Sequence, residues 1–219
     1  MPDCLIVHAP KFQNRYKPLG NYTSTQWMAL GVFALADALQ KSGLSARIVH
    51  LGLEKNLDPR FTIARYLSEN PCRVVAFSCH FHQQLYDTLR AARCVKAHDP
   101  SIYVVMGGMT SSYFAEDILA AHPQVDAVIR GEGERPLEQL VSAVVHGDSD
   151  MSKVANLVWR EGGEIRKNEQ TYFASRDDLD PLDFCNLSLM DHYAQYVEMP
   201  KIVTRLALPA KLRWKVSSL

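Results

Sequence analysis

Three short apolar runs in the middle of the chain each end in glycine or a hydroxyl residue. They span residues 74–77, 102–106 and 125–129, and they are followed by Ser78, by Gly107-Gly108 and by Arg130-Gly131-Glu132-Gly133. Runs of this length, rich in β-branched residues and separated by helical patterns, are typical of strands buried on both faces of a parallel sheet. In open α/β sheets the ligand binds beyond the carboxyl ends of the strands. The block therefore predicts both a fold and a ligand-binding edge.

Two further apolar runs, at residues 4–8 and 46–51, bring the number of predicted strands to five. Helical patterns lie between them, starting near Thr25, at Asp58-Pro59, and at residues 83–98 and 112–122, and a last helix carries Leu137, Leu140, Val141 and Val144. Because crossovers are right-handed, this alternation predicts a doubly wound parallel α/β sheet of the flavodoxin-like or Rossmann-like kind, with strand order 2-1-3-4-5. The expected site is walled by the loops after strands one, three, four and five.

The chain changes character after residue 148. Residues 156–161 and 164–168 flank Gly162-Gly163, which predicts a β-hairpin with a two-residue turn. The predicted organisation is a ligand-binding domain at 1–148, a hairpin and connector at 149–200, and a basic tail at 201–219. A loose tail is the simplest interpretation of that last segment, and docking to a partner is the alternative.

Composition excludes several classes of partner. Lys plus Arg and Asp plus Glu number 24 each, so no charge excess favours nucleic acid or an acidic membrane surface. The five cysteines show no paired CxxC spacing, and the N-terminus does not resemble a signal peptide. No apolar run approaches the roughly 18 residues that span a bilayer. A soluble protein of the cytoplasm is expected.

The glycine-rich turns are individually ambiguous. Gly107-Gly108 with Ser112 would let a ligand approach the backbone and meet free N–H groups, or would simply form a tight turn. The stretch 131–136 does not match GxGxxG, because Pro136 takes the third glycine position, so a dinucleotide fingerprint is not predicted. Glu132 and Glu134 either stabilise the next helix, because their negative charges lie near its positive N-terminal end, or hydrogen-bond a ligand.

Three histidines, His8, His80 and His82, fall near the predicted edge. A catalytic metal needs about three protein ligands, and neither HExxH nor a carboxylate at matching spacing accompanies them, so hydrogen bonding or packing is favoured over a metal site. GxSxG and GxxxxGK[ST] are also absent from the sequence.

Taken in order, these features resemble a known family. The residues that carry the resemblance are Pro10 and Pro18-Leu19-Gly20 before the first helix, Ser78, Gly107-Gly108 with Ser112, Val125-Asp126, and Arg130-Gly131-Glu132-Gly133-Glu134. Their arrangement over about residues 3 to 200 is similar to the N-terminal cobalamin-binding domain of cobalamin-dependent radical S-adenosylmethionine enzymes.

The resemblance implies a corrinoid lying across the carboxyl edge of the sheet, with its nucleotide tail directed to the turn after the fourth strand. Ser78 would hydrogen-bond the tail, and Gly107 and Gly108 would let it pass. The full set of cofactor-binding residues implied is Pro10, Leu19, Gly20, Ser78, Cys79, His80, Gly107, Gly108, Ser112, Gly131, Glu132 and Gly133.

Two departures limit what the resemblance implies. The DxHxxG motif is missing, since Asp58 precedes Pro59-Arg60-Phe61-Thr62, so cobalamin is expected in a histidine-off state, with His80 or His82 as an alternative ligand. CxxxCxxC is also missing and no cysteine follows Cys185, so no iron-sulfur cluster is expected in this chain.

The chain is thus expected to be either a truncated form of a longer enzyme or a carrier serving a separate radical S-adenosylmethionine domain or subunit, without catalysis of its own. Two alternatives remain open. One is a flavodoxin-like domain that binds a flavin or nucleotide at the same edge, and the other is a non-catalytic interaction scaffold.

Overall fold

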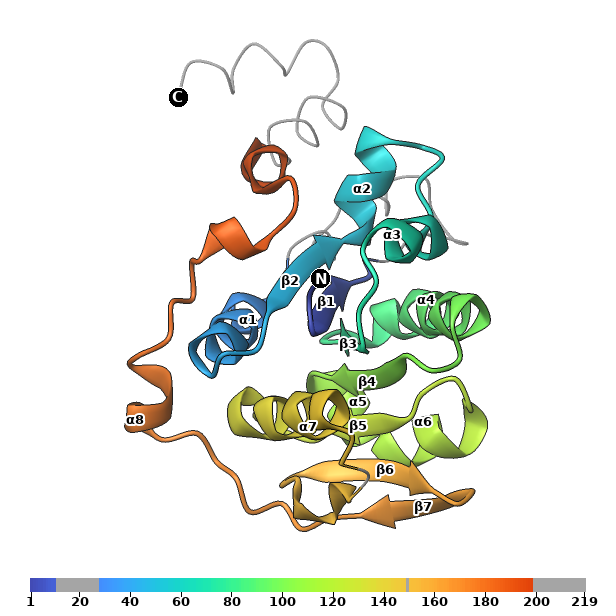
Figure 1. Cartoon of the computed structure of the whole chain (residues 1–219), viewed down its shortest axis with the longest axis vertical. Helices are drawn as coiled ribbons and strands as arrows, with labels where there is room; N and C mark the ends of the chain where they lie inside the picture. The colour runs from blue at the N-terminus through green and yellow to red at the C-terminus, as the bar shows by residue number, and fades with distance from the viewer. Residues whose placement is uncertain (11–27, 149, 199–219) are drawn as a thin grey trace.

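The computed structural model describes residues 1–10, 28–148 and 150–198. A single sheet runs through it in the order β2-β1-β3-β4-β5-β6-β7 (Figure 1). The strands are β1 Cys4–His8, β2 Ala46–His50, β3 Val74–Ser78, β4 Tyr103–Gly107, β5 Ala127–Ile129, β6 Leu157–Glu161 and β7 Glu164–Lys167. The first five strands pair in parallel, which confirms the predicted doubly wound sheet and its order.

Both faces of the parallel sheet are buried, as the continuous apolar runs predict. Alternate strand residues feed two separate cores: Cys4 and Ile6 of β1 belong to one, Leu5 and Val7 to the other. Helices α1 and α7 cover the first face, and α3, α4 and α6 cover the second (Figure 1). The α-helices are α1 Gly31–Lys41, α2 Leu51–Leu57, α3 Ile63–Glu69, α4 Leu85–His98, α5 Met109–Tyr113, α6 Ala115–Ala121, α7 Glu134–His146 and α8 Arg176–Leu179, and the 3-10 helices are η2 His82–Gln84, η3 Met151–Lys153 and η4 Leu187–Leu189.

The prediction that Asp58-Pro59 opens a helix is wrong. Residues directly after β2 form α2, and Asp58 is the residue that ends it. The Asp58 carboxylate accepts from the backbone N–H of Arg60 at 2.9 Å, so it closes a local turn instead of capping a helix. The next helix begins after Thr62, whose hydroxyl accepts from the Arg65 N–H at 3.2 Å.

Two other helix boundaries differ from the sequence prediction. The single helix expected at 112–122 is divided at Phe114 into α5 and α6. The expected start of the first helix at Thr25 and the long loop before it lie outside the described residues, apart from the first residues of that loop.

The predicted hairpin is confirmed, and it extends the sheet. Gly162 and Gly163 have φ values of 57° and 92°, the positive pair that a tight two-residue hairpin turn needs. Strand β6 pairs antiparallel with β5, so the hairpin continues the sheet beyond the parallel strands. All four residues of the edge strand β7 are exposed, and three are charged, which disfavours pairing with another chain.

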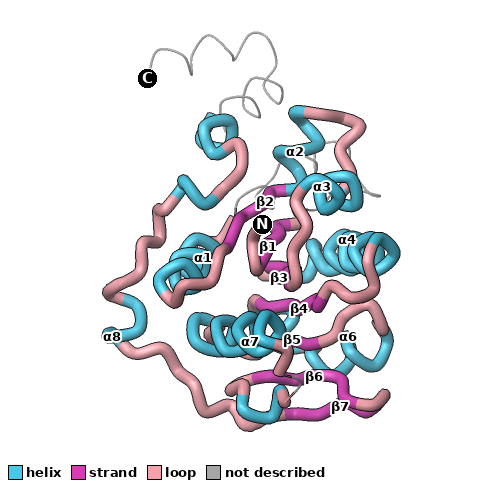
Figure 2. The backbone as a smooth tube through the Cα atoms, viewed as in Figure 1, coloured by secondary structure: helices cyan, strands magenta, loops and turns pink. Residues whose placement is uncertain are grey.

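The chain then returns across the molecule as a segment we call the strap, residues 169–191. Figure 1 shows it in orange, leaving β7 and passing α8 on its way to β2, and Figure 2 shows that most of it is loop. On α1, the buried Asp37 carboxylate accepts from the Asp183 N–H at 2.9 Å and from Asn186 Nδ2 at 3.1 Å. At its end Met190 forms a parallel bridge with Ile48 of β2. The strap therefore connects the two edges of the sheet.

None of the described helices combines the length and apolar character needed to cross a bilayer.

Candidate cofactor pocket

A cavity of about 780 Å³ opens at the carboxyl ends of β3, β4 and β5, between helices α1 and α7. Its floor is apolar and comes from the sheet and the two helices, while polar groups lie at the mouth. The apolar part includes Ile6, Val32, Leu35, Ala76, Val105, Ile129 and Leu137, and the mouth includes Ser78, His80, Gly107, Gly108, Ser112, Gly131, Glu132, Gly133, Glu134 and Gln170. The cavity opens at the edge where the sequence predicts a site, and the segments after β3, β4 and β5 line it as expected, but Ala9 and Pro10, the described residues after β1, do not.

Strand register explains why the cavity lies over β3 and β4. The last row of the sheet on the α1 and α7 face reads His50, His8, Ser78, Gly107 across β2, β1, β3 and β4. The two histidines are buried and fill their part of the row, but Ser78 and Gly107 are small. In the row below, Ala76 is the small residue. Side-chain volume thus drops at one point of the sheet.

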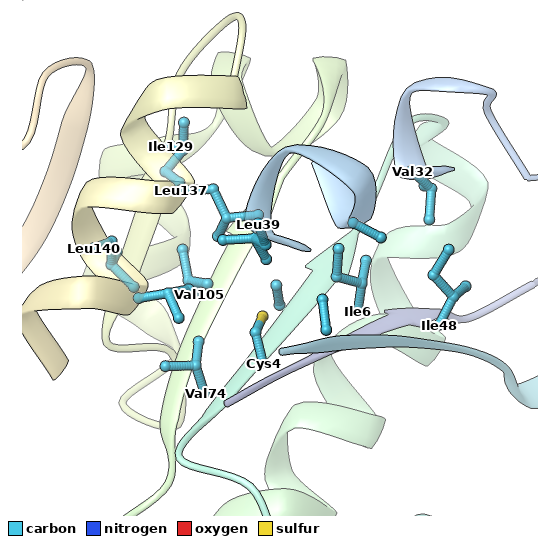
Figure 3. Close-up of a cluster of buried hydrophobic side chains, with 14 of the residues drawn as sticks. Cys4, Ile6, Val32, Leu39, Ile48, Val74, Val105, Ile129, Leu137 and Leu140 are labelled. Carbon is cyan, nitrogen blue, oxygen red and sulfur yellow. The ribbon is translucent and has the colours of Figure 1, made fainter. Parts of the chain in front are cut away.

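Below that row the same face is closely packed. Cys4 and Val74, at the starts of β1 and β3, lie beneath side chains of α1 and α7, among them Leu39 and Leu140 (Figure 3). None of these four side chains belongs to the cavity lining, and all four are fully buried. The hollow is therefore confined to the carboxyl end of the sheet.

Gly107 and Gly108 have different roles. Gly108 has φ of +99°, and a Cβ there would lie 2.7 Å from the Cys79 carbonyl oxygen, so the fold itself requires glycine. A Cβ on Gly107 would meet no atom within 4 Å. Of this pair, Gly107 is therefore the glycine whose missing side chain leaves space that a ligand could use.

Ser112 joins the two turns that frame the pocket. Its hydroxyl donates to the Gly108 carbonyl at 2.9 Å and accepts from the Gly131 N–H, also at 2.9 Å. The serine predicted as a ligand contact therefore already bonds the turn after β4 to the turn after β5.

The loop between β5 and α7 forms another wall. Gly131 has φ of +73°, and a Cβ on Gly133 would lie 3.3 Å from Leu35 of α1. The Glu132 carboxylate accepts from the Ala174 N–H of the strap. Burial raises the pKa of Glu134, against a lowering by the N–H groups of Glu134 and Gly133, and among the described residues its Oε2 has no hydrogen-bond partner.

The three histidines do not converge on the pocket. His80 lines the pocket, and its backbone holds it in place. The backbone N–H donates to Gln84 Oε1 at 3.1 Å, and the backbone carbonyl accepts from the Thr110 hydroxyl at 3.1 Å. His8 is buried with its ring centroid 4.9 Å from that of His50, and His82 is exposed on η2. Across the described ranges no three His, Cys, Asp or Glu side chains are grouped so as to hold a metal ion.

Four predicted site residues are not seen in the pocket. Cys79 is fully buried outside the lining, and burial raises the pKa of its thiol to about 11. Pro10 is buried and does not belong to the lining, and Leu19 and Gly20 lie outside the described residues.

Sequence reasoning also missed three residues at the mouth. Met109 and Tyr113 are 61% and 83% exposed there, and the signal available was an apolar residue directly after the glycine pair. Gln170, from the strap, gave no local signal at all.

Comparison with known proteins decides the family. The model of the B12 binding domain matches residues 16–141, more than half of the chain. This chain belongs to the B12-binding domain family. The matched region contains the turns after β3, β4 and β5 and most of α7.

Relatives of this B12-binding chain are longer proteins. An uncharacterized methyltransferase of Pyrococcus horikoshii, PH0819, is 29% identical over 136 residues, which is 62% of this chain and 29% of the relative. The hopanoid C-3 methylase of Methylococcus capsulatus is 28% identical over 116 residues, 52% of this chain and 22% of that enzyme. The chain thus spans less than a third of the length of these relatives.

A solved structure shares the fold. The cobalamin-dependent S-adenosylmethionine radical enzyme OxsB, with aqua-cobalamin and S-adenosylmethionine bound, superimposes with a TM-score of 0.64 at 15% identity. The match covers 90% of this chain and 25% of OxsB. With that coverage the shared fold extends past the five parallel strands.

Proposed function

We propose that this chain is a cobalamin-binding module that binds the corrinoid at the pocket between α1, α7 and the ends of β3 to β5, without catalysis of its own. The observation that carries the proposal is the local hollow made by Ala76, Ser78 and Gly107 in a chain of the B12-binding family. The site residues proposed are those of the predicted set that line this pocket, with Met109 and Tyr113 added at its mouth.

The residues present fit a corrinoid. Cobalamin combines a broad macrocycle rimmed by amides with a flat aromatic base on a nucleotide tail. The space between α1 and the sheet, walled by Val32, Leu35 and Ile129, is apolar and suits the base, whereas the amide rim needs the polar mouth. Ser78 and His80 belong to the mouth, and we propose that they hydrogen-bond the tail. Bound cobalamin would supply a redox-active cobalt centre.

We propose the histidine-off state for the bound cofactor. Neither His8 nor His82 lines the pocket, which leaves His80 as the alternative ligand. Electron paramagnetic resonance of the cob(II)alamin form tests this, because a nitrogen ligand splits each cobalt line into three. Unsplit lines are expected, and splitting that disappears in His80→Ala would contradict the proposal.

A separate radical S-adenosylmethionine domain or subunit is the proposed catalytic partner. The support is that the relatives are much longer than this chain, and that no cysteine follows Cys185 to hold an iron-sulfur cluster here. The proposed location is the cytoplasm, in keeping with five free cysteines.

Corrinoid retention tests the proposal directly. The purified protein is mixed with hydroxocobalamin, passed through gel filtration and scanned in the visible range. Gly107→Leu should fold and lose retention, since its side chain enters open pocket space. Ala97→Leu, on the exposed side of α4, is the matched control and should keep it. A wild-type protein that retains no corrinoid at micromolar concentration would refute the function.

A flavin or nucleotide is the second candidate, supported by the same glycine-lined edge. Ser112 belongs to the Gly107-Gly108-x-x-x-Ser112 spacing behind this candidate, and its hydroxyl is engaged by Gly108 and Gly131. Thermal shift with flavin mononucleotide and with adenine nucleotides separates this candidate from cobalamin binding. A ligand at 100 times its dissociation constant stabilises the fold by about 2.7 kcal/mol, so the absence of any shift would remove the candidate. No observation favours the interaction scaffold, whose tail lies outside the described residues.

A further inference from the structure

One side chain of the pocket comes from outside the five-stranded unit. Gln170 lies in the strap, just after β7, and within the described ranges it is the strap residue that lines the cavity. Its Nε2 is 3.0 Å from the position that a Cβ on Gly131 would take. The glycine thus leaves room for the amide to lie against the turn after β5.

On the C-terminal side of Gln170 the strap is bonded to Asn156, the residue just before β6. Asn156 Nδ2 donates to the Tyr172 carbonyl at 2.8 Å, and the Tyr172 N–H donates to Asn156 Oδ1 at 3.1 Å. On the N-terminal side, the Glu169 carbonyl accepts from the Asn156 N–H at 3.0 Å. Gln170 is therefore held between two anchored residues, both bonded to Asn156.

Two more contacts fasten the same segment to the loop that begins α7. The Ala174 N–H donates to the Glu132 carboxylate, and Arg135 pairs with Asp178 at 2.8 Å. Residues 169–178 are thus attached to the loop between β5 and α7 through Glu132 and to the first turn of α7 through Arg135. A segment attached in this way keeps its side chain at the cavity when the loop meets a ligand.

The polar groups around Gln170 define what it can recognise. The charged residues that line the same cavity are Arg130, Glu132 and Glu134, and its interior is apolar. A primary amide donates and accepts at once, so its complement is another primary amide. The rim of a corrin ring carries such carboxamides, and the tail does not carry them.

We propose that the strap is a wall of the cofactor site and that the Gln170 amide pairs with a carboxamide on the corrin rim. This rests on the proposed function of cobalamin binding. It means that the ligand-binding unit does not end with α7, because a residue beyond the hairpin contacts the ligand.

Dissociation rates of two corrinoids test the proposal with the full chain. Aquacobalamin and dicyanocobinamide share the amide rim, but cobinamide lacks the nucleotide tail. Gln170→Ala should speed dissociation of both by the same factor, about five- to tenfold, as expected for one lost hydrogen bond. Gln170→Asn should fall between, and Glu169→Ala, the adjacent exposed residue outside the lining, should match the wild type.

Each other outcome overturns the proposal in a distinguishable way. Unchanged rates for Gln170→Ala would remove the contact while leaving cobalamin binding intact, and an effect on aquacobalamin alone would place Gln170 on the tail. A wild type that binds neither corrinoid would refute the proposed function as well. Hydrogen exchange on the wild type is independent of any variant's folding: residues 170–174 should exchange more slowly when aquacobalamin is bound, and equal exchange would overturn the proposal.

Discussion

The two faces of the sheet are built from the same strands, yet one is filled and the other is hollow. On the face covered by α3, α4 and α6, strand β3 contributes Val75 and Phe77, and Phe77 is among the largest fully buried side chains. On the face covered by α1 and α7 the same strand contributes Ala76 and Ser78 at the same level. Alternation along a strand therefore allows one face to stabilise the fold while the other keeps a cavity.

The largest difference is expected between Gly107→Ala and Gly108→Ala, because the fold requires glycine at the second position and not at the first. Gly108→Ala places a Cβ against the Cys79 carbonyl in a positive-φ conformation, so we expect a loss of about 3 kcal/mol or more in unfolding free energy. Gly107→Ala should stay within about 0.5 kcal/mol, because its Cβ meets nothing within 4 Å. Urea unfolding measures both, and equal losses would contradict the division of roles between the two glycines.

One substitution made on each face tests the contrast itself. Ala92→Leu, in α4 on the filled face, should cost about 1–3 kcal/mol, because that core has no room for three more carbons. Ala76→Leu should change stability by less than about 1 kcal/mol, since its side chain would enter the cavity, and should weaken corrinoid binding at least about tenfold. The comparison fails if Ala76→Leu destabilises the fold as much as Ala92→Leu does.

Acid should loosen the hollow face through Asp37, which joins α1 to the strap. Burial alone would raise the pKa of Asp37, but the N–H of Asp183, Lys41 and Asn186 together lower it below the ordinary value of 3.8. A lowered folded-state pKa gives stability that is present above the unfolded pKa and lost as pH falls through the folded one. Asp37→Asn should cost about 1–2 kcal/mol at pH 6, and the difference should shrink as the pH falls below 4.

Urea midpoints of the wild type and Asp37→Asn at pH 6, 5, 4 and 3 provide the measurement. Asp99→Asn, whose exposed carboxylate is bonded only within its own turn, is the control and should show a much smaller difference at pH 6. A difference between Asp37→Asn and wild type that persists at pH 3 would mean that the carboxylate acts through its shape and not through its charge.

The smallest effect expected is that of Ser112→Ala. Removing the hydroxyl breaks the bond to the Gly108 carbonyl and leaves the Gly131 N–H without it, at a cost of about 1 kcal/mol. The free energy of corrinoid binding should fall by a similar amount, because the two turns that Ser112 joins frame the mouth of the pocket. If binding is lost completely while stability is unchanged, Ser112 contacts the ligand instead.

The sequence was sufficient for elements whose signal is local. The buried strands, the glycine turn of the hairpin and the edge at which the cavity opens all follow from periodicity and from turn residues. Asp58-Pro59 misled because aspartate before proline suits both a helix start and a turn, and only the presence of α2 decides between them. Long-range contacts left no local trace, so the joining of β6 to β5, the buried position of Cys79 and the approach of Gln170 to Gly131 could not be foreseen.

The bridge between Ile48 and Met190 also bears on how the chain folds during synthesis. Strand β2 leaves the ribosome early, but the segment that pairs with its open edge is made only after every other strand. At common translation rates of about 5–20 residues per second, that edge waits on the order of ten seconds. During this interval the outer edge of β2 lacks its bridge to Met190, and an open strand edge can pair with another chain.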